Sequence, residues 1–244
     1  MRLSICGTDE RSLCLKTLAL QKGYTVTDQS PDAVVLPLPK AKLGDVKRLY
    51  GEGQKVMYGL GDEALMEVAR AYGWQMQSVF EDEAYQMENA WLTAEGALYL
   101  AMKQKRCAFY RAKCMVVGYG RIGSALTRML RGMGAEVTVA ARKEAARKAA
   151  GENSIPMEGI KECISSMDYI FNTVPSPVMG KRELEKMRKD AILMELASAP
   201  YGIDMEAALE LQLPVQIEGG IPGRYCPMQA ARAWLEGIER SVLL

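Results

Sequence analysis

Histidine is absent from the 244-residue sequence, and this absence excludes several kinds of catalytic site. Without an imidazole there is no Ser-His-Asp triad, no Cys-His pair and no histidine-ligated zinc. Any proton transfer must use Glu, Asp, Lys, Tyr, Cys or water. None of the six cysteines forms a C-x-x-C pair, so we expect free thiols and no metal site.

An excess of charge of one sign is also missing. The sequence has 31 basic and 30 acidic residues, a net charge of +1, which gives no electrostatic reason to bind nucleic acid or an anionic membrane. No apolar run approaches the ~20 residues that span a bilayer. Residues 1–7 are typical of a short strand and a turn, not of a secretion signal. We therefore expect a cytoplasmic protein.

Apolar strand patterns alternate with helical patterns, which predicts two α/β domains. Residues 1–88 form a small N-terminal domain in this interpretation. Residues 89–226 form a Rossmann domain that includes a linker helix with Thr93 as its N-cap. A C-terminal helix, 227–244, is expected to pack back on the first domain. The predicted fold is thus two Rossmann-like parallel-sheet domains with a cleft between them, linked by helices.

A glycine motif opens the second domain. The apolar stretch 114–117 is followed at once by G-x-G-x-x-G and then by helical spacing from Ser124 to Met133. In a strand–turn–helix context these glycines permit the tight turn, the approach of a pyrophosphate and close helix–strand packing. We assign to a dinucleotide site Gly118, Tyr119, Gly120, Arg121, Ile122 and Gly123. The alternative is a glycine turn that binds nothing.

The end of the second strand selects between the two nicotinamide dinucleotides. A site for NAD places Asp or Glu there to accept from the ribose hydroxyls. This chain has Ala141, followed by Arg142 and Lys143. The missing acid and the added cations favour a 2′-phosphate and hence NADP(H). The alternative is that Arg142 is a solvated residue at a helix start.

Three later strands end in loops rich in Pro, Gly and small polar residues. Ligands of open parallel sheets lie at such carboxyl ends, so we expect the loops to border a cleft facing the first domain. Ordinary turn chemistry is the alternative for each residue. The first two loops supply the remaining predicted cofactor residues, which are Asn172, Thr173, Val174, Pro175, Ala197 and Ser198.

The ordered motifs from Asn89 to about residue 232 together resemble the A subunit of dipicolinate synthase. They include Thr93-Ala94-Glu95-Gly96, the glycine turn, Ala141-Arg142, Asn172-Thr173-Val174-Pro175, Leu196-Ala197-Ser198 and Gly220-Ile221-Pro222-Gly223. The family tends to have Asp, Lys and Gly at Glu195, Ala199 and Tyr201. The linker helix and glycine turn are also similar to D-2-hydroxyacid dehydrogenases, which use a catalytic histidine that this chain lacks.

The resemblance implies NADP-linked oxidation of dihydrodipicolinate, derived from 4-hydroxy-tetrahydrodipicolinate, to dipicolinate in sporulation. It also implies a partner, the flavoprotein-like B subunit of dipicolinate synthase. We expect Arg224 and Ser198 to hold substrate carboxylates, and Asn172 and Thr173 to border the nicotinamide. Glu95 is the weakest acid–base candidate, since a place near a helix N-terminus also favours a structural role. An NADPH-dependent reductase of another small carboxylate, a non-catalytic NADP-binding protein that needs a partner, and a homo-oligomer all stay open.

Overall fold

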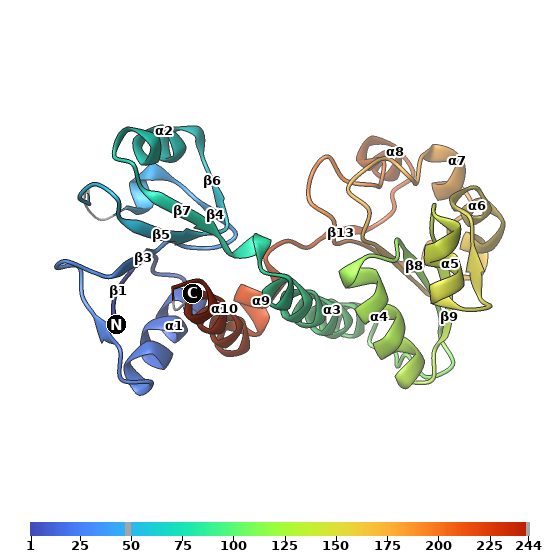
Figure 1. The fold of residues 1–244 in the computed structure, drawn as a ribbon. Helices are drawn as coiled ribbons and strands as arrows, with labels where there is room; N and C mark the ends of the chain where they lie inside the picture. Colours follow the sequence, from blue (N-terminus) through green and yellow to red (C-terminus); the bar gives the residue numbers. More distant parts are fainter. Residues whose placement is uncertain (47–49, 243–244) are drawn as a thin grey trace. The chain divides into compact units, whose positions relative to one another are not determined.

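The computed structural model describes residues 1–46 and 50–242, and the chain divides into two compact units (Figure 1). The first unit contains Met1–Leu92 and Pro222–Leu244, and the second contains Thr93–Ile221. Both are built on parallel sheets, so the predicted two-domain α/β class is confirmed. Within the described residues, no helix is long and apolar enough to cross a membrane.

The sheet of the first unit has five parallel strands in the order β2-β1-β3-β5-β7. Successive side chains point to opposite faces of a strand. Accordingly, Leu3 and Val35 enter one core, whereas Val34 and Val56 enter the other. Burial on both faces is typical of parallel sheets. The strands are β1 (Arg2–Ile5), β2 (Thr25–Val26), β3 (Ala33–Val35), β5 (Lys55–Tyr58) and β7 (Gln75–Ser78), with a separate pair β4 (Lys40–Ala41) and β6 (Leu60–Gly61).

Helices from both ends of the chain cover this sheet. α1 (Glu10–Gln21) and α10 (Pro227–Val242) contribute to the same core, with Trp234 fully buried in it. α2 (Glu63–Ala71) supplies Leu65 and Ala69 to the opposite core. Residues 243 and 244 of the predicted C-terminal helix lie outside the described residues. Short 3₁₀ turns occur at Leu43–Asp45 and Val79–Glu81.

The linker helix α3 (Glu83–Lys105) begins well before the predicted N-cap. The acidic run at 81–83 is typical of a break between elements, but the Asp82 carboxylate accepts from the backbone N–H groups of Ala84 and Tyr85 at 3.0 and 3.3 Å. It thereby caps the first turn. Thr93, predicted as the N-cap, is therefore a buried residue in the middle of the helix.

The second unit has six parallel strands in the order β10-β9-β8-β11-β12-β13. Numbered within the unit this order is 3-2-1-4-5-6, that of a Rossmann fold. The strands are β8 (Lys113–Val117), β9 (Glu136–Ala140), β10 (Ser154–Ile155), β11 (Tyr169–Asn172), β12 (Ile192–Glu195) and β13 (Val215–Ile217). The carboxyl ends of β8 and β11 lie next to each other, because Val117 pairs with Asn172.

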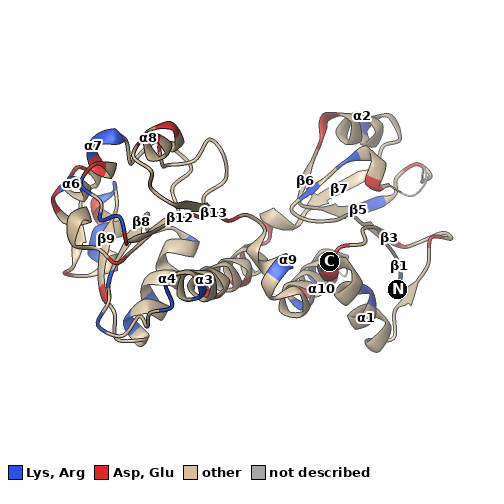
Figure 2. Ribbon diagram, turned by 180° about the vertical axis from the view of Figure 1, so that it is seen from behind, with Lys and Arg blue, Asp and Glu red and all other residues tan. Residues whose placement is uncertain are grey.

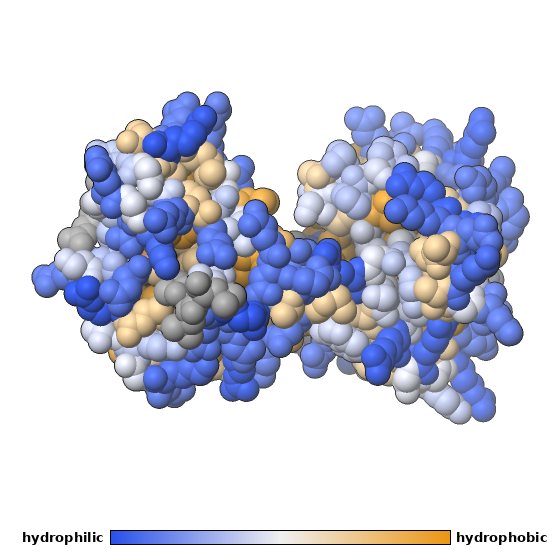
Figure 3. Space-filling view, in the orientation of Figure 1, coloured by the Kyte–Doolittle hydropathy of each residue, from blue (hydrophilic) through white to orange (hydrophobic). Residues whose placement is uncertain are grey.

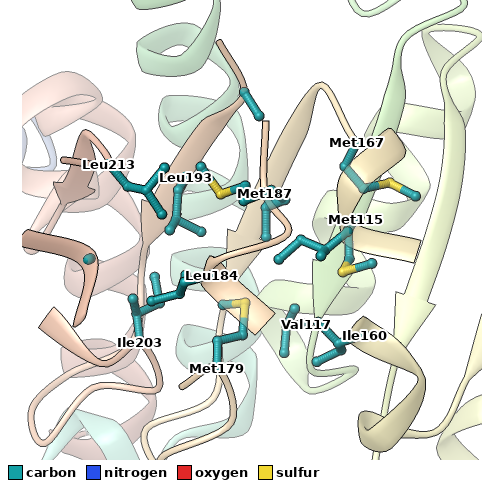
Figure 4. Packing of buried hydrophobic residues seen from close by; sticks show 14 of the residues in the cluster. Met115, Val117, Ile160, Met167, Met179, Leu184, Met187, Leu193, Ile203 and Leu213 are labelled. Atoms are coloured by element: carbon teal, nitrogen blue, oxygen red, sulfur yellow. The ribbon is translucent and has the colours of Figure 1, made fainter. Parts of the chain in front are cut away.

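One face of this sheet packs into a core rich in methionine, shown in Figure 4. Met115 and Val117 come from the central strand, and Leu193 comes from β12. They meet Ile160 and Leu184 from the short helices that follow the strands. The helices of the unit are α4 (Arg121–Gly132), α5 (Glu144–Ala150), α6 (Ile160–Cys163), α7 (Lys181–Leu184) and α8 (Met205–Glu210), with 3₁₀ turns at Met157–Gly159 and Ile164–Ser166; α9 (Ile221–Tyr225) begins at the boundary of the units.

Charges of both signs are spread over each unit (Figure 2). Hydrophilic residues also cover most of the visible face of each unit (Figure 3). This distribution agrees with the near-neutral net charge of the sequence.

Candidate functional site

The turn between β8 and α4 requires glycine at two places. Gly118 has φ +96°, and an added Cβ would lie 2.4 Å from Thr173 Oγ1. An added Cβ at Gly123 would lie 2.2 Å from the carbonyl oxygen of Gly118. Thr173 Oγ1 donates to the Val117 carbonyl at 2.9 Å, which fixes the loop after β11 against the turn. Close packing around the first and third glycines therefore forms the turn.

Gly120 differs from the other two glycines, because an added Cβ would meet nothing within 4 Å. It is the N-cap of α4, a helix of 12 residues, and no side chain caps the helix there. The space above Gly120 is therefore open to a ligand. Backbone N–H groups and the positive end of the helix dipole favour an anion at such a place.

A cavity of about 400 Å³ lies over this turn. Its lining comes from the carboxyl ends of β8, β9 and β11 and from residues nearby, namely Gly118, Tyr119, Gly120, Ala141, Arg142, Lys143, Ala146, Met157, Thr173, Val174, Pro175, Ser176 and Val178. The structure thus brings together most of the predicted cofactor residues. Those outside the lining are Arg121, Ile122, Gly123, Asn172, Ala197 and Ser198.

The β9 side of the cavity is basic. Ala141 is buried, whereas Arg142 and Lys143 are exposed, and no carboxylate is among the residues that line the cavity. Arg147 Nη1 donates to the carbonyl oxygens of Ala141 and Arg142 at 2.9 and 2.8 Å. Arg147 therefore fixes the backbone that carries the two cations. No local pattern signals this role, because it depends on how α5 folds back on the strand end.

A buried carboxylate organises the strand ends beside the cavity. Glu195, at the end of β12, is 0% exposed. Its two oxygens accept from Asn172 Nδ2 at 2.7 and 2.9 Å and from the backbone N–H groups of Ala197, Gly202 and Ile203 at 2.9, 2.9 and 3.1 Å. Every partner is a donor, so both oxygens act as acceptors.

Asn172 connects this carboxylate to the loop after β11. Its side-chain oxygen accepts from Val174 N at 3.2 Å, and Nδ2 donates to the Val174 carbonyl at 3.0 Å. Asn172 is 0% exposed. Its amide is therefore engaged within the protein, where Asn172 holds Val174, which lines the cavity. That Asn172 borders the nicotinamide stays a prediction. Sequence alone could not predict the network, since its members come from two strands and a loop.

The three predicted substrate or proton-transfer residues come from three different segments of the chain. Glu95 is an exposed residue inside α3, so its predicted place near a helix N-terminus is wrong. Ser198 is exposed in the loop after β12 of the second unit. Arg224 is exposed on α9, in the first unit, where its Nη2 donates to the Tyr225 hydroxyl at 3.0 Å.

Cysteine does not supply a nucleophile in the central strand. None of the six cysteines, all of which lie in the described residues, forms a disulfide. Burial raises the pKa of the Cys114 thiol from 9.0 to about 12, and the carboxylate of Asp168 adds to this effect. The thiol therefore stays protonated near neutral pH, and a protonated thiol is a poor nucleophile.

Comparison with protein families agrees with this geometry. The model of the D-isomer specific 2-hydroxyacid dehydrogenase, NAD binding domain, matches residues 75–210. The chain belongs to this family. The family's NAD binding domain indicates a nicotinamide cofactor.

Individual relatives refine the comparison. The A subunit of dipicolinate synthase from Bacillus subtilis (strain 168) is 26% identical over 180 residues, 72% of this chain and 61% of that protein. Glyoxylate reductase of Thermococcus gammatolerans is 29% identical over 102 residues, 39% of this chain and 29% of that protein. The match thus spans about three fifths of the first relative's length. The resemblance inferred from the motifs is confirmed.

The fold is shared with a solved relative over almost its full length. The crystal structure of the dipicolinate synthase A subunit from Bacillus halodurans aligns with a TM-score of 0.85, covering 99% of this chain and 97% of that one at 21% identity. At this identity the likeness establishes the fold alone.

Proposed function

We propose that this chain is an NADP(H)-dependent oxidoreductase that oxidises dihydrodipicolinate to dipicolinate, in the role of the A subunit of a dipicolinate synthase. The observation that carries the cofactor choice is the β9 side of the cavity, which offers Arg142 and Lys143 and no carboxylate. A guanidinium can pair with both oxygens of a phosphate, and the absence of an acid removes repulsion.

The residues present fit this cofactor. Gly120 leaves open space at the N-terminus of α4, where the pyrophosphate would bind. Arg142 and Lys143 would hold the 2′-phosphate, and Thr173, Val174 and Pro175 would border the nicotinamide half. Glu195 and Asn172 keep this last loop in place. When bound, NADP⁺ would take up the hydride that leaves the substrate.

The similarity to the A subunit of the Bacillus subtilis enzyme supports the substrate. The lack of histidine is compatible with this reaction. The oxidation removes one hydride and one proton, and the proton can leave to solvent because the product ring becomes aromatic. The protein then has mainly to orient the ring, which is a proximity effect. A flavoprotein-like B subunit of the synthase, and a role in sporulation, belong to the same proposal.

The test is a fluorescence titration of the purified chain with NADPH and with NADH. We expect NADPH to bind more tightly. Arg142→Ala should weaken NADPH binding by about 10-fold or more, since charge-assisted hydrogen bonds contribute about 1.5–3 kcal/mol, and should leave NADH binding unchanged. Arg182→Ala, an exposed arginine on α7, is the matched control. Equal affinity of the wild-type protein for NADPH and NADH would contradict the cofactor choice.

A second assay tests the reaction. The chain, alone and together with the B subunit, is supplied with NADP⁺ and dihydrodipicolinate, and the formation of dipicolinate and NADPH is followed. Binding of NADPH without turnover in either mixture would refute the substrate and favour the reduction of another small carboxylate.

A further inference from the structure

Arg11 is a buried cation in the first unit, far along the chain from the glycine turn. It lies in the first turn of α1 and is 5% exposed. The motifs that point to the cofactor site do not include it. A charged side chain in such a place requires a physical reason, because arginine is almost never buried without a partner.

The guanidinium of Arg11 is enclosed by three elements of the first unit. The Trp234 ring of α10 lies on one side, with the ring centroid 6.0 Å from Cζ. Gly223 of α9 lies close by, since a Cβ added there would be 3.3 Å from Cζ and 3.5 Å from Nε. Nη2 donates to the Leu38 carbonyl at 2.5 Å. Burial raises the pKa of Tyr85, whereas the charge of Arg11 and a side-chain hydrogen bond between Arg11 and Tyr85 act in the opposite direction.

These contacts leave the cation without an anion. Among the described residues no carboxylate lies within ion-pair distance of Arg11, and its buried Nε has no hydrogen-bond partner. The neighbouring Asp9 is engaged as the cap of α1, where it accepts from Ser12 N at 3.2 Å and from Ser12 Oγ at 2.5 Å. A lone buried charge is costly unless a partner neutralises it.

The position in the helix adds to the cost. The N-terminal turn carries the positive end of the helix dipole, which favours acidic side chains and disfavours a cation. Two independent features, the unpaired Nε and the cation at the positive helix end, therefore point to an external anion. Trp234 and Gly223 both lie near the guanidinium and restrict the space into which it can turn. The planar fork of a guanidinium matches the two oxygens of a carboxylate.

We propose that Arg11 binds a carboxylate group of the substrate on the first unit. This inference rests on the proposed function and names a residue for it: the site takes a small carboxylic acid, and a dicarboxylate in particular. Arg224 supplies a second cation on α9, the element whose Gly223 adjoins Arg11.

The experiment uses pyridine-2,6-dicarboxylate as the probe, titrated calorimetrically into the full chain saturated with NADP⁺. The variants are Arg11→Met, which removes the charge at similar length, and Arg11→Lys, which keeps the charge and loses the fork. Arg70→Met, at an exposed position of α2, is the control. We expect at least 10-fold weaker probe binding in Arg11→Met, intermediate binding in Arg11→Lys, and wild-type binding in the control, since a charge-assisted hydrogen bond contributes about 1.5–3 kcal/mol.

Two further readouts separate binding from structure. Arg11→Met should keep wild-type affinity for NADPH and melt at the wild-type temperature or above, because a buried unpaired charge is gone. If Arg11 served structure alone, its replacement would lower the melting temperature and leave probe binding unchanged.

Wild-type affinity for the probe in both folded variants, or no binding of the probe to the wild-type protein, would overturn the assignment. Failure of the wild-type chain to bind NADPH would instead overturn the proposed function. The carboxylate site would still stand if apoprotein bound the probe and Arg11→Met did not.

Discussion

Replacement of Glu195 by Gln tests whether one buried carboxylate organises the strand ends beside the cavity. Glutamine has nearly the same shape, but its amide nitrogen cannot accept. Each carboxylate oxygen faces at least two donors, Ala197 N with Asn172 Nδ2 on one side, and Gly202 N with Ile203 N on the other. With the amide nitrogen at the first position, Ala197 N loses its acceptor, whereas Asn172 Nδ2 keeps the other oxygen at 2.9 Å. With the nitrogen at the second position, Gly202 N and Ile203 N both lose their acceptor.

A buried donor left unsatisfied costs about 1–3 kcal/mol. The amide takes the orientation that leaves one donor unsatisfied, so the free energy of unfolding falls by about 1–3 kcal/mol. The melting temperature should fall by at least about 2 °C. Thermal denaturation followed by circular dichroism measures this, with Glu185→Gln as the exposed control. A melting temperature within about 1 °C of wild type would refute this account of the network.

The glycine turn gives two contrasting variants. Gly120→Ala should keep the melting temperature within about 2 °C, because its Cβ meets nothing within 4 Å, but it should weaken NADPH binding by filling the open space. Gly123→Ala places a Cβ 2.2 Å from the Gly118 oxygen and should lower both the melting temperature and the NADPH affinity. Equal behaviour of the two variants would contradict the division of roles. Ala141→Asp restores the missing acid, so titration should show NADPH binding weakened by about 10-fold or more and NADH binding strengthened; an unchanged preference would argue against a 2′-phosphate site there. The raised pKa of Cys114, about 12 against 9.0 in the unfolded chain, predicts an alkaline limb to stability. Above pH 9 the thiol ionises only in the unfolded chain, so this residue's contribution is lost as the pH rises from about 9 to 12, with about 2–3 kcal/mol gone at pH 11. Urea denaturation at pH 8 and pH 11 should show a smaller loss for Cys114→Ala, and the same loss in both proteins would contradict it.

Local sequence signals are sufficient for the Rossmann core. The apolar strand, the three glycines and the amphipathic helix are adjacent in the chain, so they predict the β8–α4–β9 unit and the basic residues after β9. The start of α3 escapes prediction because the capping residue, Asp82, stands in an acidic run that is typical of a turn. Local sequence patterns thus predict which helices and strands form, whereas the residue at which a helix begins can depend on a single capping hydrogen bond.

The parts of the site that depend on distant residues could not be predicted. Asn172 and Glu195 meet because β11 and β12 are neighbours in the sheet, so pattern alone assigns Asn172 to the cofactor. Arg11 becomes notable only when Trp234 and Gly223, from the other end of the chain, enclose it. The burial of a side chain and the partners available to it are properties of the folded molecule, and they determine the roles of the Asn172–Glu195 network and of Arg11.

The first unit is assembled from both ends of the chain, with residues 93–221 inserted between them. This arrangement sets an order of events on the ribosome. The nucleotide-binding unit is complete, and free to fold, before Trp234, Leu235 and Ile238 have been made, although these side chains fill the core of the first unit. Until translation reaches α10, the core on this side of the N-terminal sheet therefore has α1 but lacks the side chains of α10. Premature termination just before α10 would thus spare the nucleotide-binding unit and abolish the other.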